Sequence, residues 1–250
     1  MTQRRTAVAA AAIALAVGLT TGCGGEDDAA AKPQQPKRET AAATPATQDP
    51  TPEAPVSRSP ATSQKNLSKA QLEQSILAKG DAPGFNVGPL GAPPSQGESA
   101  DKPECAPLTA VINGKPEPLA QASAYRQLTG AKDDRPAVSE FLSAHGAQGA
   151  ATVLSRLRTA VEACKGGFTA SGGEGPSTYR SVKALPVAEV GDDAFAYQVT
   201  GDFEGDPVPL VFQVVRCGGT LATYYTANLE GPATPQIPQI LLTAQVAKLS

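Results

Sequence analysis

Few residues of this chain have the types and spacing that an active site requires. His145 is the sole histidine of the sequence, and any serine that approached it in space would form a nucleophile and general base pair. No G-x-S-x-G motif accompanies it, so the sequence does not indicate a nucleophile elbow. We interpret His145, which precedes Gly146, as an exposed residue of a turn. A hydrolase that uses His145 is therefore the weakest hypothesis for this chain.

Two other short patterns suggest chemistry but lack the residues that would complete it. Ser99 and Lys102 match S-x-x-K, a motif of penicillin-interacting enzymes, but the partner motifs S-D-N and K-T-G are absent. Asp202, Glu204 and Asp206 have the spacing of the first ligands of a calcium loop, yet its glycine is misplaced and its twelfth residue is not Glu. A solvated hairpin turn explains these acidic residues more simply. We expect no enzyme, no metal site and no cofactor.

Cys23 follows a segment with the features of a bacterial lipoprotein signal. A pair of arginines precedes an uncharged run from Thr6 to Leu19, which is typical of a secretory signal and short of the about 20 apolar residues of a membrane span. Small residues then lead to Cys23 in a pattern that resembles the lipobox, although Thr20 stands where Leu is usual. We expect residues 1–22 to be a signal peptide with a lipobox and Cys23 to be acylated. The alternative is an ordinary cleaved signal with an incidental cysteine.

The next segment has nothing to bury. Between Gly24 and Asn66 there is no aromatic residue, Leu, Ile or Met, and Val56 is the sole large apolar residue among many prolines. Such a segment cannot repay the entropy of ordering. We therefore expect residues 23–66 to be a lipidated, disordered tether with a mean span of about 35–40 Å. A diacylglyceryl anchor at Cys23 would hold the protein at the outer face of the cell membrane.

Residues 67–250 have the size and composition of one domain. All six Phe and all five Tyr fall inside this part of the chain. The formal net charge of the whole chain is −3 and there is no run of Lys and Arg. Nucleic-acid binding, which requires clustered basic residues, is therefore not expected.

Hydrophobic periodicity in this domain predicts an α+β fold, with a largely antiparallel sheet and flanking helices. A capping box at Ser68 begins a first helix, and Gly218-Gly219 is typical of a two-residue hairpin. We expect the core on the face that Leu210, Phe212 and Val214 share, and a Pro/Gly-rich loop from Phe85 to Pro103. The other predicted strands are Leu119–Leu128, Ala137–Leu142, Tyr179–Leu185, Ala194–Phe203, Val208–Cys217 and Thr220–Ala227, and the other predicted helices are Ala150–Lys165 and Pro235–Leu249.

Three cysteines remain in the domain, and an oxidising compartment favours a disulfide. Cys105, Cys164 and Cys217 allow three pairings. We favour Cys105–Cys164, because Cys164 ends the apolar face of the predicted helix and Cys105 lies in a loop with little else to hold it. Cys217 would then be a free thiol on the sheet face opposite the expected core.

Several short motifs in the domain occur in a familiar order. They are Leu67-Ser-Lys-Ala-Gln-Leu, Asp81-Ala-Pro-Gly-Phe, Glu162-Ala-Cys164, Gly191-Asp-Asp-Ala194 and Val215-Arg-Cys-Gly218. In these motifs the chain resembles actinobacterial surface lipoproteins related to the extracellular sensor domain of the mycobacterial serine/threonine kinase PknH. The resemblance implies a sandwich-like α+β domain with a cleft proposed to hold a ligand. The family has no agreed catalytic residues, so none is carried over to this chain. That sensor domain has two disulfides, whereas this chain has cysteines for one internal bridge.

Together these features predict a membrane-anchored, extracytoplasmic lipoprotein with a non-enzymatic, sensor-like module that binds an unknown ligand. We expect the ligand in a cleft between the sheet and the helix at Ala150–Lys165, because ligand sites are concave and mostly apolar. The alternative is a structural or adaptor protein of the envelope that binds another protein. A lipid carrier and a hydrolase are weaker alternatives.

Overall fold

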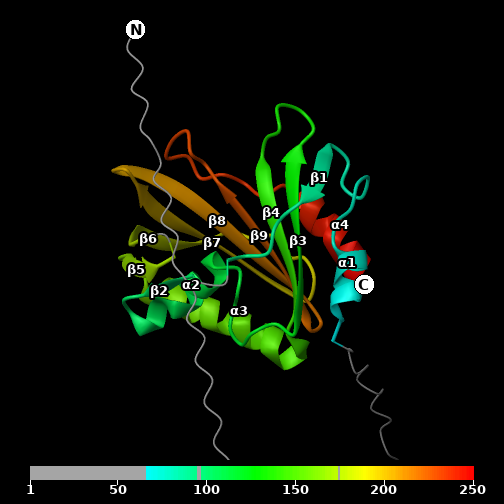
Figure 1. The fold of residues 1–250 in the computed structure, drawn as a ribbon, viewed down its shortest axis with the longest axis horizontal. Helices are drawn as coiled ribbons and strands as arrows, with labels where there is room; N and C mark the ends of the chain where they lie inside the picture. Colours follow the sequence, from blue (N-terminus) through cyan, green and yellow to red (C-terminus); the bar gives the residue numbers. More distant parts are fainter. Residues whose placement is uncertain (1–65, 95–96, 174) are drawn as a thin grey trace, which may run out of the picture. The chain divides into compact units, whose positions relative to one another are not determined.

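The computed structural model of the protein describes residues 66–94, 97–173 and 175–250. In these residues, nine strands form one antiparallel sheet and four α-helices pack on it (Figure 1). The α+β class predicted from the sequence is therefore confirmed. None of the helices in this part of the chain is long and apolar enough to cross a membrane. Cys23, the predicted signal peptide and nearly all of the predicted tether lie outside the described residues.

The elements alternate along the chain in short runs of helices and strands. The helices are α1 (Lys69–Ser75), η1 (Pro103–Cys105, a 3-10 helix), α2 (Ala106–Ile112), α3 (Gly146–Ala163) and α4 (Gln239–Leu249). The strands are β1 (Phe85–Pro89), β2 (Glu98–Ala100), β3 (Ala122–Gly130), β4 (Ala137–Ala144), β5 (Phe168–Gly172), β6 (Ser177–Leu185), β7 (Asp193–Phe203), β8 (Asp206–Cys217) and β9 (Thr220–Ala227).

The sheet is built from a long meander that closes on an earlier hairpin. Its strand order is β1-β3-β4-β9-β8-β7-β6-β5-β2. Strands β5 to β9 follow one another as neighbours, and β9 then returns to pair with β4. The two strands that come first in the sequence, β1 and β2, form the two opposite edges of the sheet.

The hairpin between β8 and β9 has the two-residue turn that the glycines predict. Cys217 pairs with Thr220, so Gly218 and Gly219 alone form the turn, and Gly218 has φ +59°. At Gly219 a Cβ atom would lie 2.8 Å from the Cα of Gly146 at the start of α3. A side chain at this position would therefore push the hairpin away from α3.

One face of the sheet is covered by α2 and α3. The periodic apolar residues of α3 are buried against the strands, as the sequence predicts, and Tyr197 of β7 stacks on Phe212 of β8 with ring centroids 5.3 Å apart. The prediction that this face holds the core is thus confirmed, and we call this cluster of buried residues the first core. The buried α3 residues are Ala150, Val153, Leu154, Leu157, Ala160 and Val161.

The opposite face holds a second core that the sequence analysis did not anticipate. Helices α1 and α4 lie side by side over it (Figure 1). Leu72 of α1 and Leu241 of α4 are fully buried there, together with Val215 of β8. The signal was present, since β8 is apolar at consecutive positions and not only at alternate ones. Such a run is typical of a strand buried on both faces.

The segment from Phe85 to Pro103, predicted as a loop, contains both edge strands. Because β1 pairs with β3 and β2 pairs with β5, each of these short strands depends on a partner distant in sequence. Strand β3 begins at Ala122, later than predicted, and Leu119 is 69% exposed. The sequence analysis also missed α2 and β5.

Glu140 of β4 is a buried acid in the second core. Its side chain is fully buried, and neither carboxyl oxygen has a hydrogen-bond partner among the described residues. It lies opposite Tyr224 of β9, whose hydroxyl also lacks a partner. Burial in apolar surroundings raises the pKa of Glu140 to about 8, and the positive charges of Lys248 and Arg126 offset only part of this rise.

This raised pKa predicts that the fold loses stability as the pH rises. The unfolded Glu140 releases its proton near pH 4.3, whereas the folded one keeps it to about pH 8. Since the native state binds more protons over this interval, the free energy of unfolding should fall between about pH 5 and pH 8. The variant Glu140→Gln should remove that part of the slope and raise the melting temperature more at pH 8 than at pH 5. Thermal unfolding at both pH values measures this, and an equal effect at both would contradict it.

Candidate functional site

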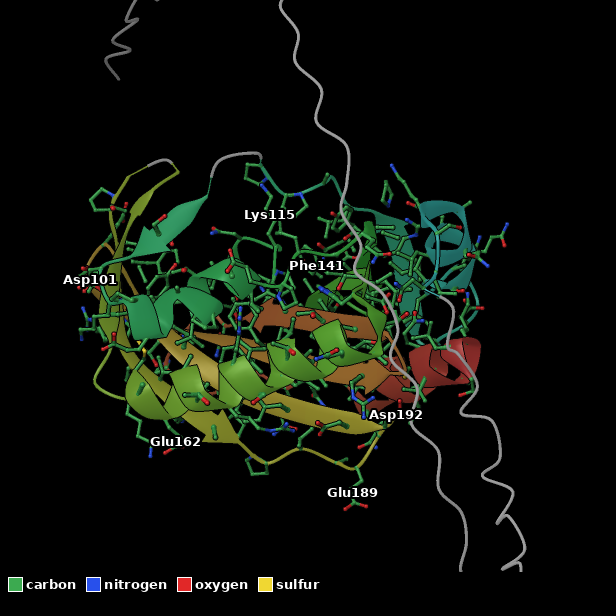
Figure 2. The ribbon with its side chains drawn as sticks, turned by 90° about the horizontal axis from the view of Figure 1, so that it is seen from below. Asp101, Lys115, Phe141, Glu162, Glu189 and Asp192 are labelled. Atoms are coloured by element: carbon green, nitrogen blue, oxygen red, sulfur yellow. A yellow bond between two sulfur atoms is a disulfide. The ribbon has the colours of Figure 1, made fainter. Side chains whose placement is uncertain are left out.

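Two adjoining grooves flank helix α2 on the surface of the domain. One, of ≈ 410 Å³, lies between α2 and α3, and the other, of ≈ 340 Å³, lies between α2 and strand β2. Ala106 and Glu117 line both grooves. We call this surface the α2 trough. Figure 2 shows α2 beside α3, with Lys115 farther toward Phe141 and Asp101 near β2.

The trough exists because α2 has large side chains on one side only. Leu108 and Val111 are buried in the first core, whereas Ala106 and Ala110 face the trough. Alanine fills little space, so the outer side of the helix is left hollow between its neighbours. A larger side chain at Ala106 would enter both grooves.

A disulfide holds α2 beside α3. Cys105, at the start of α2, is joined to Cys164, at the end of α3, with the two Cα atoms 5.9 Å apart. This separation lies in the usual range for a disulfide. Both cysteines are buried. The pair is the one favoured from the sequence, and Glu104 and Ala106 on either side of Cys105 line the groove between the two helices.

The groove between α2 and α3 combines apolar walls with a few charges. Pro103, Pro107 and Ala160 contribute apolar surface, and Glu104 and Arg156 supply charge at its rim. Its volume lies in the range of small-ligand sites. This geometry suits a ligand with an apolar body and polar ends.

The groove between α2 and β2 contains a half-buried carboxylate that two hydroxyls hold. Glu98 accepts hydrogen bonds from the Tyr179 hydroxyl, at 2.6 Å, and from the hydroxyl of Ser177. Burial first, and then the bond to Glu98, raise the pKa of Tyr179, so it stays protonated and donates. The Asn113 side chain bonds the main chain of Glu98 through both its amide oxygen and its amide nitrogen.

The ligand cleft was expected between the sheet and α3. That interface is filled by packed side chains, among which Leu154, Leu157 and Val214 are buried. The grooves lie instead on the outer side of this layer, against α2. A helix with so complete an apolar face packs directly on the sheet.

His145 is not the exposed turn residue that we expected. It is buried, its Nδ1 lies 2.7 Å from the carbonyl oxygen of Pro118, and its Nε2 lies 3.0 Å from Ser143 Oγ. Because a carbonyl only accepts, Nδ1 carries the proton and Nε2 accepts from Ser143. Burial lowers the pKa of His145, which keeps the ring neutral.

This serine–histidine pair has the hydrogen bonding of a nucleophile and base but lacks access. Ser143 is 5% exposed and His145 is 8% exposed, and neither lines the α2 trough. The pair has a structural effect, since the hydrogen bond from His145 to the Pro118 carbonyl oxygen fastens the loop at Pro118 to the end of strand β4. That loop carries Glu117 and Leu119, which wall the trough.

The residues of the S-x-x-K pattern and of the calcium-loop pattern have structural roles in the fold. Ser99 lies in β2, and Lys102 donates to the carbonyl oxygen of Gly167. Asp202 pairs with Arg180 at 2.5 Å and accepts from the Gly205 N–H, which forms a hairpin turn. Among the residues described by the structure, no three His, Cys, Asp or Glu side chains gather in a way that could hold a metal ion.

Cys217 is a half-buried free thiol that packs against the second core, opposite the first. Burial, and then the nearby Asp192 carboxylate, raise the pKa of the thiol to about 11. The thiolate is therefore scarce at neutral pH, and the cysteine is unreactive.

The residues of the trough were not found from the sequence. Glu98 of β2 and Asn113 at the end of α2 line the trough, but β2 and α2 were themselves missed, and Tyr179, which bonds Glu98, lies far along the chain in β6. The pairing of β2 with β5 and of β5 with β6 brings Glu98 to Tyr179. No local sequence pattern predicts that Glu98 and Tyr179 lie together.

Comparison with known proteins yields only weak likeness, and only among solved structures. No protein-family model and no curated protein sequence matches the chain. Among solved structures, the fold is similar to the crystal structure of the extracellular domain of PknH from Mycobacterium tuberculosis. The identity is 10%, the match covers 74% of this chain and 97% of that one, and the TM-score is 0.49. At this level the likeness is one of fold and implies nothing about function.

The disulfide should contribute strongly to the stability of the domain. Its cysteines are separated by 59 residues, and closing such a loop stabilises a fold by about 4 kcal/mol in the chain-entropy model. The double variant Cys105→Ser, Cys164→Ser should lower the free energy of unfolding by up to that amount in denaturant titrations. The control Cys217→Ser should cost about 1 kcal/mol or less. Equal losses in the two variants, or a mapped disulfide at Cys217, would contradict this assignment.

Proposed function

We propose that the protein is a lipid-anchored module at the outer face of the cell membrane that binds a ligand in the α2 trough. The observation that carries this proposal is the trough itself, whose two grooves have volumes of ≈ 410 and ≈ 340 Å³ and mix apolar and polar walls. The ligand contributes to a binding or sensing process and is not chemically changed. No cofactor takes part.

The proposed location rests on the chain before the domain. A secretory signal pattern leads to Cys23, and a proline-rich segment without large apolar residues follows it. The Cys105–Cys164 disulfide supports the same location, because disulfides persist in oxidising compartments. A tether of this kind lets the domain reach beyond the membrane surface.

The proposal of a non-enzymatic module rests on the state of the nucleophilic groups. Ser143 is enclosed beside His145, and the raised pKa of Cys217 keeps its thiol protonated. In the α2 trough, Glu98 is held by hydroxyl groups and the grooves present no activated nucleophile among the described residues.

An adaptor that binds another protein is the second candidate. Exposed apolar side chains favour it, with Leu229 74% exposed, Leu119 69% exposed and Phe203 50% exposed. They come from three separate segments of the domain, before β3, at the end of β7 and after β9. Scattered apolar residues are common on protein surfaces, so this observation is weaker than the trough.

The anchor can be tested by changing the proposed attachment point. With Cys23→Ser, we expect the exported protein in the medium, because no acyl chain then holds it, whereas the wild-type protein stays in the membrane fraction. Cys217→Ser is the matched control and should leave the protein with the membrane. Fractionation and immunoblotting measure the distribution. Retention of the Cys23→Ser protein in the membrane would show that lipidation at this residue is not the anchor.

Ligand binding can be tested by native mass spectrometry of the full Cys23→Ser chain, exported in a related bacterial host and purified gently. We expect an additional mass that is lost on denaturation. The variant Ala106→Trp, which fills the trough, should remove this mass. Ala151→Trp is the control, since Ala151 is an exposed residue of α3 that lines neither groove. A bare mass, or a ligand that both variants retain, would refute binding in the trough.

A further inference from the structure

The outer edge of strand β2 presents main-chain groups to the α2 trough. Strand β2 is the last strand of the sheet, and it pairs only with β5. The Asp101 N–H bonds the carbonyl oxygen of Thr169 at 2.9 Å, which shows that Asp101 faces β5. Since bonded residues alternate along an antiparallel strand, Ser99 also faces β5, and the main-chain groups of Glu98 and Ala100 point away from the sheet.

At Glu98 this edge is already occupied by the side-chain amide of Asn113, which bonds it as a peptide group would. Asn113 Oδ1 accepts from the Glu98 N–H at 3.0 Å, and Asn113 Nδ2 donates to the Glu98 carbonyl oxygen at 2.8 Å. A neighbouring strand would make the same pair of hydrogen bonds. Gly97 permits this approach, because a side chain there would collide with Asn113.

At Ala100 the same edge borders the open groove. Ala100 lines the groove of ≈ 340 Å³ together with Ala106 and Ala110 of α2. No hydrogen bond from its outward N–H or carbonyl oxygen to another described residue is found. Unpaired main-chain groups at a sheet edge are a template for pairing with another chain.

We propose that the outer edge of β2 binds a short extended peptide by strand addition. The peptide would bond the main chain of Ala100 in the groove and displace the Asn113 carboxamide from Glu98. This inference rests on the proposed function and deepens it, because it names the class of ligand that the trough takes. The residues that line the groove include two acids, Glu98 and Glu117, and one lysine, Lys115, so a peptide with a basic side chain is favoured.

The test uses the full Cys23→Ser chain and a random heptapeptide phage library as the probe. We expect selected peptides to bind, and we expect alternate N-methylation of their amides to abolish binding, because strand addition needs those N–H groups. Ala100→Pro removes one outward N–H without disturbing the ladder to β5, as proline is tolerated at a sheet edge. It should weaken binding about tenfold. Ala100→Ser, which keeps the N–H, should bind as the parent does.

The variant Asn113→Ala gives a prediction of opposite sign. It removes the group that competes with the peptide at Glu98, so the affinity should rise several-fold, and the Glu98 amide should become slower to exchange when peptide is added. Thermal unfolding of every variant verifies that it is folded. Peptides that bind Ala100→Pro and the parent equally would overturn the inference, as would a selection that yields no peptide. Self-association of the Asn113→Ala variant without peptide binding would also overturn the inference. Asn113 would then serve only to cover the β2 edge against pairing with a second copy of the chain.

The outcomes separate this inference from the proposed function. If native mass spectrometry finds a ligand that Ala106→Trp removes, but no peptide binds at β2, the trough is a site for another class of molecule and the peptide inference is wrong. If peptides bind at β2 as described while the Cys23→Ser protein remains in the membrane, the peptide site stands and the proposed anchor fails. The absence of both a ligand mass and a bound peptide would refute both.

Discussion

The burial of strand β8 on both of its faces is the constraint on which the rest of the structure depends. Leu210, Phe212 and Val214 lie on one face, and Val211 and Val215 lie on the other, with all five nearly or completely buried. A strand of this kind must be the centre of a sheet whose two faces are both covered. Helices α2 and α3 cover one face and α1 and α4 the other. The meander from β5 to β9 and the return of β9 to β4 place β8 in that central position.

The surface trough is a consequence of this core. Helix α3 packs its apolar face onto the sheet, and the disulfide at Cys105 fastens α2 beside α3. Because α2 turns alanines outward, the space beside it stays open. The loop that walls this space is held in place by the bond from His145 to Pro118. A buried histidine that resembles part of a catalytic pair thus contributes to shaping a binding surface.

The polar groups near the trough have hydrogen-bond partners, whereas those buried in the second core do not. The first set shapes the candidate binding surface, and the second affects the stability of the fold. Near the trough, Glu98, Asn113 and Tyr179 satisfy one another, and the cost of partly burying them is offset by charge-assisted and amide hydrogen bonds. In the second core, Glu140 and Tyr224 have no partner of good geometry among the described residues. Their burial costs free energy, and the raised pKa of Glu140 predicts that the stability of the fold depends on its protonation.

The sequence alone determined the elements whose information is local. The apolar period of α3, the capping box at Ser68 and the glycine pair at Gly218 each act through neighbours within a few residues, and each of them is found in the structure. The α+β class followed from these elements together. The pattern at Cys23 is equally local, and it supports a hypothesis about location that lies outside the described residues.

Tertiary structure decided the edges of the sheet, the second core and the trough. Strands β1 and β2 are too short to form by their own preference, and β1 also contains Gly88 and Pro89. They exist because β3 and β5 supply partners. Glu98 meets Tyr179 only through the register of three strands. Such contacts join residues about 80 positions apart, and their free energy depends on packing and on excluded water. No sequence period encodes that dependence, so the candidate site could be read only from the folded chain.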